Sequence, residues 1–291
     1  MAKIIVLVGI PGVGKTTYGR SLIESSPNKE KMVLLSADDI RAEIYGSADI
    51  VGDPGRVFNI MHQRKKKFLE DGIDVIFDAT SLTRKGRRCA FANIPEGTEK
   101  EIHIVWAPVQ LCIDRDSKRM RTVGSEGIWR RAKEYQPPYY DECENIKLVV
   151  NCEHDYKNYR AHCIEALFIP HDNPHHTFDV YQHSRAAADY AKDHGMNDEI
   201  WRAALYHDIG KPDTKFMRYN PTEKRKVGTY YQHDQLGGWM AYGISPYNPL
   251  LLSWLIGNHM HPYYNSTYYN EMGPELKGML DQLHECDVNA H

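Results

Sequence analysis

Hydrophobic and polar positions change their pattern about halfway along this 291-residue chain. In the first half, short apolar runs such as Lys3 to Val8 alternate with stretches of helical periodicity such as 16–25. A continuous apolar run is typical of a strand buried on both faces, and the alternation predicts a parallel sheet with crossover helices. Further strands are expected at 32–35, 75–77, 101–106 and 147–151, and further helices at 57–70 and 109–120.

The second half has helical periodicity only. After Ile169 and Pro170 no segment has the pattern of a strand. Helices are expected at 178–193, 198–207, 235–242 and 250–257, and the tyrosine-rich stretch 263–269 is expected to be a loop. Because prolines break helices, the linker is expected within 168–174. The sequence therefore predicts an α/β domain over 1–168 and an all-α domain over 169–291.

Composition narrows the classes of protein that fit. The net charge of −3 argues against a protein held to nucleic acid by bulk charge, although a local basic groove stays compatible with it. No apolar run approaches the roughly 20 residues of a membrane span, so no membrane partner is expected. The six cysteines are scattered without a Cys-x-x-Cys pair. Scattered thiols indicate reduced cysteines and a cytoplasmic location.

A phosphate-binding motif follows the first predicted strand. Gly-x-x-x-x-Gly-Lys-Thr, between a strand and a helix, places backbone amides and a helix N-terminus around phosphates, so we expect ATP to bind here. Lys15 would reach the β- and γ-phosphates, and Thr16 would bind Mg²⁺. The residues expected to bind the nucleotide are Gly9, Pro11, Gly12, Val13, Gly14, Lys15, Thr16 and Thr17.

Three further polar clusters can serve a phosphoryl transfer. Asp38 and Arg41 follow a predicted strand, where a carboxylate can take the proton of an attacking hydroxyl and an arginine can hold an acceptor phosphate. Arg115 and Arg119, spaced as on one helix face, can neutralise charge on the donor phosphates. Asp78 can line the acceptor site. Each cluster also has a purely structural interpretation. Asp38 and Arg41 could be a helix cap followed by an exposed arginine. Arg115 and Arg119 could belong to a solvated basic helix face, and Asp78 to a turn that ends a strand.

The histidine-rich second half carries a candidate metal site. Imidazoles and carboxylates are good ligands for divalent transition metals. The pair His207-Asp208 stands before Gly210 and Lys211, with His183 upstream on a predicted helix. A single His-Asp pair is most often a surface feature, and the chain has fifteen histidines. The longer pattern, with a distal aspartate, is more specific.

The first half resembles the phage-type polynucleotide 5′-kinases over about residues 1–151. The resemblance rests on the motifs Gly9 to Thr16, Asp38 to Arg41, and Arg115 to Arg119. It implies that Asp38 is the general base, that Arg41 grips the acceptor phosphate beside the reacting sugar, and that Arg115 and Arg119 are lid arginines. Ala79 departs from the pattern, since some members carry an acidic residue there, and this leaves the role of Asp78 open.

The second half resembles the HD superfamily of metal-dependent phosphohydrolases over about residues 171–291. The resemblance implies one or two divalent ions such as Mn²⁺, Co²⁺, Ni²⁺ or Fe²⁺, with Asp208 bridging two ions and Lys211 stabilising the departing oxygen. The final helix is expected to be short, and His175, His176 and His261 have no place in the pattern. The implied ligands are His183, His207, Asp208, His233, His259 and Asp287.

Together the two resemblances imply an RNA end-healing enzyme. Such an enzyme would phosphorylate a 5′-hydroxyl end of RNA, or of DNA, and hydrolyse a 2′,3′-cyclic or 3′-phosphate, preparing both ends for a ligase acting downstream. The Asp-x-Asp-x-Thr motif of an aspartate-based phosphatase is absent from the sequence. Two alternatives stay open: a nucleoside or metabolite kinase joined to a nucleotide phosphohydrolase, or a kinase joined to a degenerate HD sensing module. If Arg41 grips an acceptor phosphate, it distinguishes the end-healing enzyme from the first alternative, because a free nucleoside has no such phosphate.

Overall fold

The computed structural model describes residues 2–50, 52–120, 122–172 and 178–290. The chain forms two compact units. The first unit comprises Met1–Arg131 and Pro138–Glu153, and the second comprises Ala132–Pro137 and His154–His291. The division lies before the predicted linker, because His154 already belongs to the second unit, where its Nε2 lies 2.9 Å from the carbonyl oxygen of Gly243.

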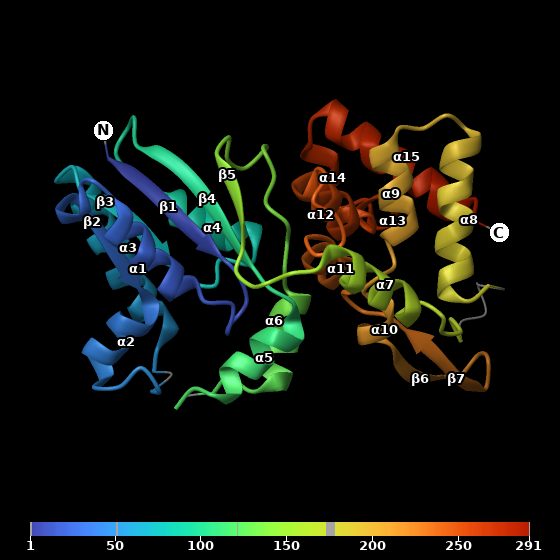
Figure 1. Cartoon of the computed structure of the whole chain (residues 1–291), viewed down its shortest axis with the longest axis horizontal. Coiled ribbons are helices and arrows are strands. Elements are labelled where there is room, and N and C mark those ends of the chain that lie inside the picture. Colours follow the sequence, from blue (N-terminus) through green and yellow to red (C-terminus); the bar gives the residue numbers. More distant parts are fainter. Residues whose placement is uncertain (1, 51, 121, 173–177, 291) are drawn as a thin grey trace. The chain divides into compact units, whose positions relative to one another are not determined.

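A five-stranded parallel sheet forms the centre of the first unit (Figure 1), which confirms the predicted α/β architecture. The strand order is β2-β3-β1-β4-β5. Central β1 is fully or almost fully buried from Ile4 onward, as its uninterrupted apolar run predicts. The strands are β1 (Lys3–Val8), β2 (Met32–Ser36), β3 (Asp74–Asp78), β4 (Glu99–Trp106) and β5 (Ile146–Val150).

Helices connect these strands as crossovers. Because the strands are parallel, their carboxyl ends share one edge of the sheet, where open α/β folds bind ligands. The register places Asp78 beside both Leu7 of β1 and Ser36 of β2. The helices are α1 (Lys15–Ser25), the short 3-10 helix Lys29–Lys31, α2 (Ala37–Tyr45), α3 (Pro54–Glu70), α4 (Arg84–Phe91), α5 (Val109–Ser117) and α6 (Ser125–Lys133).

The second unit is built mainly from helices, as predicted. Its core contains the fully buried rings of Trp239 and Trp254, together with Tyr135 and Tyr242, whose hydroxyls lie 2.6 Å apart. The helices are α7 (Tyr156–Ala166), α8 (Val180–Asp193), α9 (Asp198–Tyr206), α10 (Lys211–Thr214), α11 (His233–Ala241), α12 (Pro249–Asn258), α13 (His261–Tyr264), α14 (Thr267–Glu271) and α15 (Pro274–Val288).

Three details of the second unit differ from the prediction. An antiparallel hairpin of β6 (Phe216–Asn220) and β7 (Arg225–Thr229) interrupts the helices, so the expectation of no strands was wrong. Residues 216–219 are all exposed, so β6 has no buried face to impose an alternating pattern. The tyrosine-rich stretch forms α13 and α14 rather than a loop, since the side chain of Ser266 caps α14. The last helix, α15, is 15 residues long and not short.

Among the described residues, no helix is both long and apolar enough to pass through a membrane. All six cysteines are free thiols.

Two candidate active sites

The loop after β1 requires its glycines. Gly12 and Gly14 have φ angles of 81° and 93°, in the left-handed region that side chains disfavour. A Cβ at Gly12 would lie 2.3 Å from the carbonyl oxygen of Cys112, and one at Gly14 would lie 2.4 Å from Nδ2 of Asn151. Gly14 also directly precedes α1, so the loop leads into a helix N-terminus. This is the backbone arrangement that encloses phosphates.

Lys15 and Thr16 lie beside a carboxylate at the end of β3. The ammonium of Lys15 donates to the carbonyl oxygens of Gly9 and Ile10 at 2.8 and 3.2 Å. The hydroxyl of Thr16 donates to Oδ2 of Asp78 at 2.6 Å. Burial lowers the pKa of Lys15 and raises that of Asp78, while the charge of each favours the ionised form of the other. A hydroxyl and a carboxylate are oxygen ligands of the kind that Mg²⁺ takes, so these residues fit that ion.

Asp38 and Arg41 lie on the first turns of α2. The side chain of Ser36 caps this helix by accepting from the backbone amides of Asp38 and Asp39. Asp38 is therefore not the capping residue, and its carboxyl group stays 58% exposed. The guanidinium of Arg41, only 16% exposed, forms an ion pair with Asp38. The two residues expected to act on an acceptor are thus paired with each other.

Of the two expected lid arginines, Arg115 contacts the phosphate-binding loop, and among the described residues no hydrogen bond or ion pair joins Arg119 to it. Arg115 donates to the backbone oxygens of Asn151 at 2.8 Å and of Val13 at 3.5 Å. Arg119 lies beyond the end of α5, its side chain is 54% exposed, and its guanidinium lies 3.9 Å from the carboxylate of Asp116. Its charge nevertheless adds to burial in lowering the pKa of Lys15. The prediction that Arg115 and Arg119 share one helix face was wrong, because the helix ends at Ser117. The carboxylate of Asp116 then accepts from the backbone amides of residues 123 and 124.

Asn151 was not singled out from the sequence. Its side-chain amide donates to the carbonyl oxygen of Val13 at 2.7 Å, and its own carbonyl oxygen accepts from Arg115. It follows the last residue of β5 directly. Its position at the carboxyl end of a predicted strand was the available signal.

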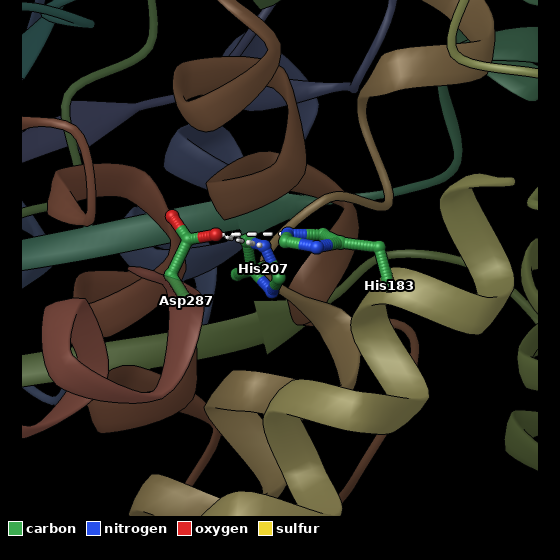
Figure 2. Close-up of side chains that lie close together, drawn as sticks. All are labelled: His183, His207 and Asp287. Atoms are coloured by element: carbon green, nitrogen blue, oxygen red, sulfur yellow. Dashed lines mark hydrogen bonds and ion pairs between the residues drawn. The ribbon is translucent and has the colours of Figure 1, made fainter. Parts of the chain in front are cut away.

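In the second unit, all six implied metal ligands converge. They come from α8, the residues after α9, the start of α11, the residue after α12, and α15. They form two groups in which the possible ligand atoms lie within 4.8 Å of one another. Figure 2 shows the first group, with a carboxylate oxygen of Asp287 directed at the imidazoles of His183 and His207. The groups are His183, His207 and Asp287, and Asp208, His233 and His259.

Three of the four histidines have the same orientation. Nδ1 of His207, His233 and His259 lies 2.7 Å from the carbonyl oxygen three residues earlier in each case. A carbonyl oxygen only accepts, so each Nδ1 carries a proton, and whenever one of these rings is neutral its lone pair is on Nε2. This is the orientation in which backbone carbonyls hold histidines that bind metals.

The Nε2 atoms of His233 and His259 face each other at 3.1 Å. With Nδ1 protonated in both rings, two lone pairs meet there, and only a cation or an added proton makes that contact favourable. Nε2 of His207 is likewise buried without a hydrogen-bond partner among the described residues. These atoms fit a divalent ion that accepts imidazole nitrogens.

Asp208 faces both groups. Its Oδ2 lies 3.3 Å from Nε2 of His207, and its Oδ1 lies 3.4 Å from Nε2 of His233. Burial opposes a charge on His207, but Asp208 and Asp287 outweigh it and raise the pKa of His207 to about 10. Burial and the neighbouring imidazoles lower the pKa of His259 to about 3. The carboxylates of the cluster therefore stabilise positive charge beside them, while the imidazole of His259 stays neutral.

Lys211 and His171 lie against this cluster. The ammonium of Lys211 is 2.7 Å from Oδ2 of Asp208, 3.2 Å from Nε2 of His171, and 5.4 Å from the ring centroid of Tyr230. His171 is 2% exposed and was not predicted, because a single histidine in a linker carries no pattern. His261 bonds to the hydroxyl of Ser266, and it is in neither of the two groups. His175 and His176 lie outside the described residues.

Residues 4–138 match the family described as AAA domain, and residues 176–286 match the family described as HD domain. The chain carries an AAA domain followed by an HD domain. The AAA domain includes the phosphate-binding loop, and the HD domain includes five of the six cluster residues, with Asp287 directly after the matched range. No curated protein matched the chain.

Several solved structures are similar to part of the chain. Two are from a Pnkp1/Rnl/Hen1 RNA repair complex, with 22% and 24% identity and TM-scores of 0.41 and 0.35. These matches cover 46% and 39% of this chain, and the chain spans 43% and 38% of those chains. A third is a gluconokinase from Sinorhizobium meliloti 1021, with 15% identity, a TM-score of 0.37, and coverage of 52% of this chain and 83% of that one.

Proposed function

We propose that this protein heals broken RNA ends. Its AAA domain transfers the γ-phosphate of ATP to a 5′-hydroxyl end, and its HD domain hydrolyses a 2′,3′-cyclic phosphate or a 3′-phosphate. The proposed hydrolytic activity is supported mainly by the Nε2 atoms of His233 and His259, which face each other with Asp208 beside them. The polynucleotide acceptor is supported by the resemblance of Asp38 to Arg41 to the phage-type kinases.

For the hydrolytic reaction, the six cluster residues would hold one or two divalent ions. Such ions neutralise phosphoryl oxygens and activate water when bound. Asp208 has one oxygen near each group, so it could serve as a ligand to ions held by both of them. Lys211 is positioned to bring a positive charge to the oxygen that departs, because Asp208, His171 and the ring of Tyr230 hold its ammonium at the edge of the cluster.

For the kinase reaction, the ion pair between Arg41 and Asp38 suggests that acceptor binding precedes proton transfer. An acceptor phosphate competes with Asp38 for the guanidinium, because both are anionic partners of arginine. Once Arg41 holds that phosphate, the carboxylate of Asp38 can accept the proton of the attacking hydroxyl. Lys15 and Arg115 lie at the phosphate-binding loop, where charge on the transferred group develops.

The acceptor assignment can be tested with two variants. Asp38→Ala is expected to lower the rate of 5′ phosphorylation by about 10²–10⁴-fold, the usual contribution of a general base, with ATP binding unchanged. Arg41→Ala is expected to reduce kcat/KM more for a nucleoside 3′-phosphate than for a free nucleoside. Steady-state kinetics with the two acceptors measure this. Equal losses on both acceptors would favour the alternative of a small-molecule kinase.

The metal assignment can be tested by supplying ions. Hydrolysis of a nucleoside 2′,3′-cyclic phosphate is expected to be faster with Mn²⁺, Co²⁺ or Ni²⁺ than with Mg²⁺, because imidazole ligands suit softer ions. Chelation should remove this activity and leave Mg²⁺-dependent phosphorylation recoverable. A protein that hydrolyses no phosphate end with any of these ions would instead fit a degenerate sensing module.

A further inference from the structure

The hairpin β6–β7 joins the cluster of the HD domain to an exposed surface. The hairpin follows α10 in the chain (Figure 1). The first residue of α10 is Lys211, and the residue directly after β7 is Tyr230. The carbonyl oxygen of Tyr230 accepts from His233, and its hydroxyl donates to the carbonyl oxygen of His171. The amide of Gly228 donates to Asp172. The base of the hairpin is therefore fixed to the residues around the cluster.

The hairpin is strongly basic although the whole chain is acidic. Residues 215–231 contain five cationic side chains and one acidic side chain, against a net charge of −3 for the chain. Lys224, Arg225 and Lys226 are consecutive and exposed. In the part of the chain that the structure describes, Arg225 lies 3.7 Å from Glu223, and no ion pair involves Lys224 or Lys226. This local charge is complementary to a polyanion.

Large aromatic side chains accompany these cations. Phe216, Tyr219 and Tyr231 are 66%, 59% and 67% exposed, in contrast to the buried rings of the core. Tyr219 pairs with Lys226 across the two strands, so both side chains lie on the same face of the hairpin. Arg218 donates a hydrogen bond to the hydroxyl of Tyr231. Cations interleaved with exposed rings can hold phosphates while bases stack on the rings.

We propose that the hairpin β6–β7 binds the single-stranded RNA that leads to the 3′ end. Its rings stack against the bases upstream of the reacting phosphate, and Lys224, Arg225 and Lys226 contact their backbone. This inference rests on the proposed function and names its substrate more closely: a strand of several nucleotides rather than a mononucleotide. Unpaired bases are favoured over a duplex because their faces are available for stacking.

Binding and hydrolysis are measured separately to test the hairpin. Fluorescence anisotropy with a short 3′-phosphorylated RNA measures affinity, with a 5′-phosphate on the RNA and Arg41→Ala in every protein to reduce the contribution of the AAA domain. Tyr219→Ala, and Lys224→Ala with Lys226→Ala, are expected to weaken binding about tenfold. The double variant should also lower the slope of log affinity against log salt by about 1.4.

The matched control is Lys192→Ala with Lys277→Ala, which removes two lysines from α8 and α15 of the same unit. It is expected to bind RNA like the parent. Hydrolysis of a nucleoside 2′,3′-cyclic phosphate should be unchanged in every hairpin variant, which also reports that the unit is folded. Hairpin variants that bind RNA as tightly as the control would overturn the proposal. A parent that binds RNA through the hairpin but hydrolyses no phosphate end would contradict the hydrolytic function alone.

Discussion

Asp208→Asn is expected to lower the hydrolysis of phosphate ends by roughly a thousandfold or more, since it removes the charge that both ligand groups share. Asp208 is 1% exposed, and its two oxygens lie near His207 and His233 respectively. Asparagine keeps the shape of the side chain while removing the charge that pairs with Lys211. The loss should therefore reflect chemistry rather than an empty space in the core.

Three measurements separate this outcome from a folding defect. Elemental analysis should find less bound transition metal in Asp208→Asn than in the parent. Phosphorylation of 5′-hydroxyl ends should be unchanged, because its residues lie in the first unit. The control Asp189→Asn changes the same charge on an exposed, 48% accessible side chain of α8 and should retain full hydrolysis. Normal metal content with normal hydrolysis in Asp208→Asn would contradict a bridging role.

Lys15→Ala is expected to reduce 5′ phosphorylation by at least about a hundredfold, because it removes a positive charge aimed at the transferred phosphate. The ammonium of Lys15 is held by the carbonyl oxygens of Gly9 and Ile10, within the loop itself. Radiolabel transfer from ATP to a 5′-hydroxyl RNA measures the effect. Hydrolysis by the HD domain should be unchanged and so reports that the protein is intact.

The control for this variant is Lys66→Ala, on the exposed surface of α3, where Lys66 pairs with Glu70. It removes the same charge from the same unit and should phosphorylate RNA normally. A Lys15→Ala protein with the activity of this control would mean that the loop does not bind the transferred phosphate. The glycine geometry of the loop would then need another explanation.

The sequence predicted the parallel sheet and the residues of the cluster, because each has a recognisable local pattern of residues. The apolar runs of β1, β3 and β4 predicted the parallel sheet, because a strand buried on both faces admits few polar residues. The six cluster residues were named from the spacing implied by the resemblance, and the fold brings them together from five parts of the second unit. Their roles as ligands stay a prediction.

Features that depend on tertiary contacts were not predicted. Arg119 continues the spacing of Arg115, but Asp116 redirects the chain after α5 through contacts that no local pattern shows. His171 lies beside Lys211 only because the segment after α7 returns to the cluster. The strand β6 lacked a signal because its residues are exposed on both faces. That exposure, which hid the hairpin in the sequence, is what makes it a candidate surface for RNA.

One incubation tests the central claim most directly. The full chain is mixed with ATP, Mg²⁺, Mn²⁺ and a short RNA that carries a 5′-hydroxyl and a 2′,3′-cyclic phosphate, and mass spectrometry identifies both ends of the product. A 5′-phosphate together with an opened or removed cyclic phosphate is the predicted result. An RNA that keeps both of its original ends, while the same protein phosphorylates a free nucleoside, would contradict the account.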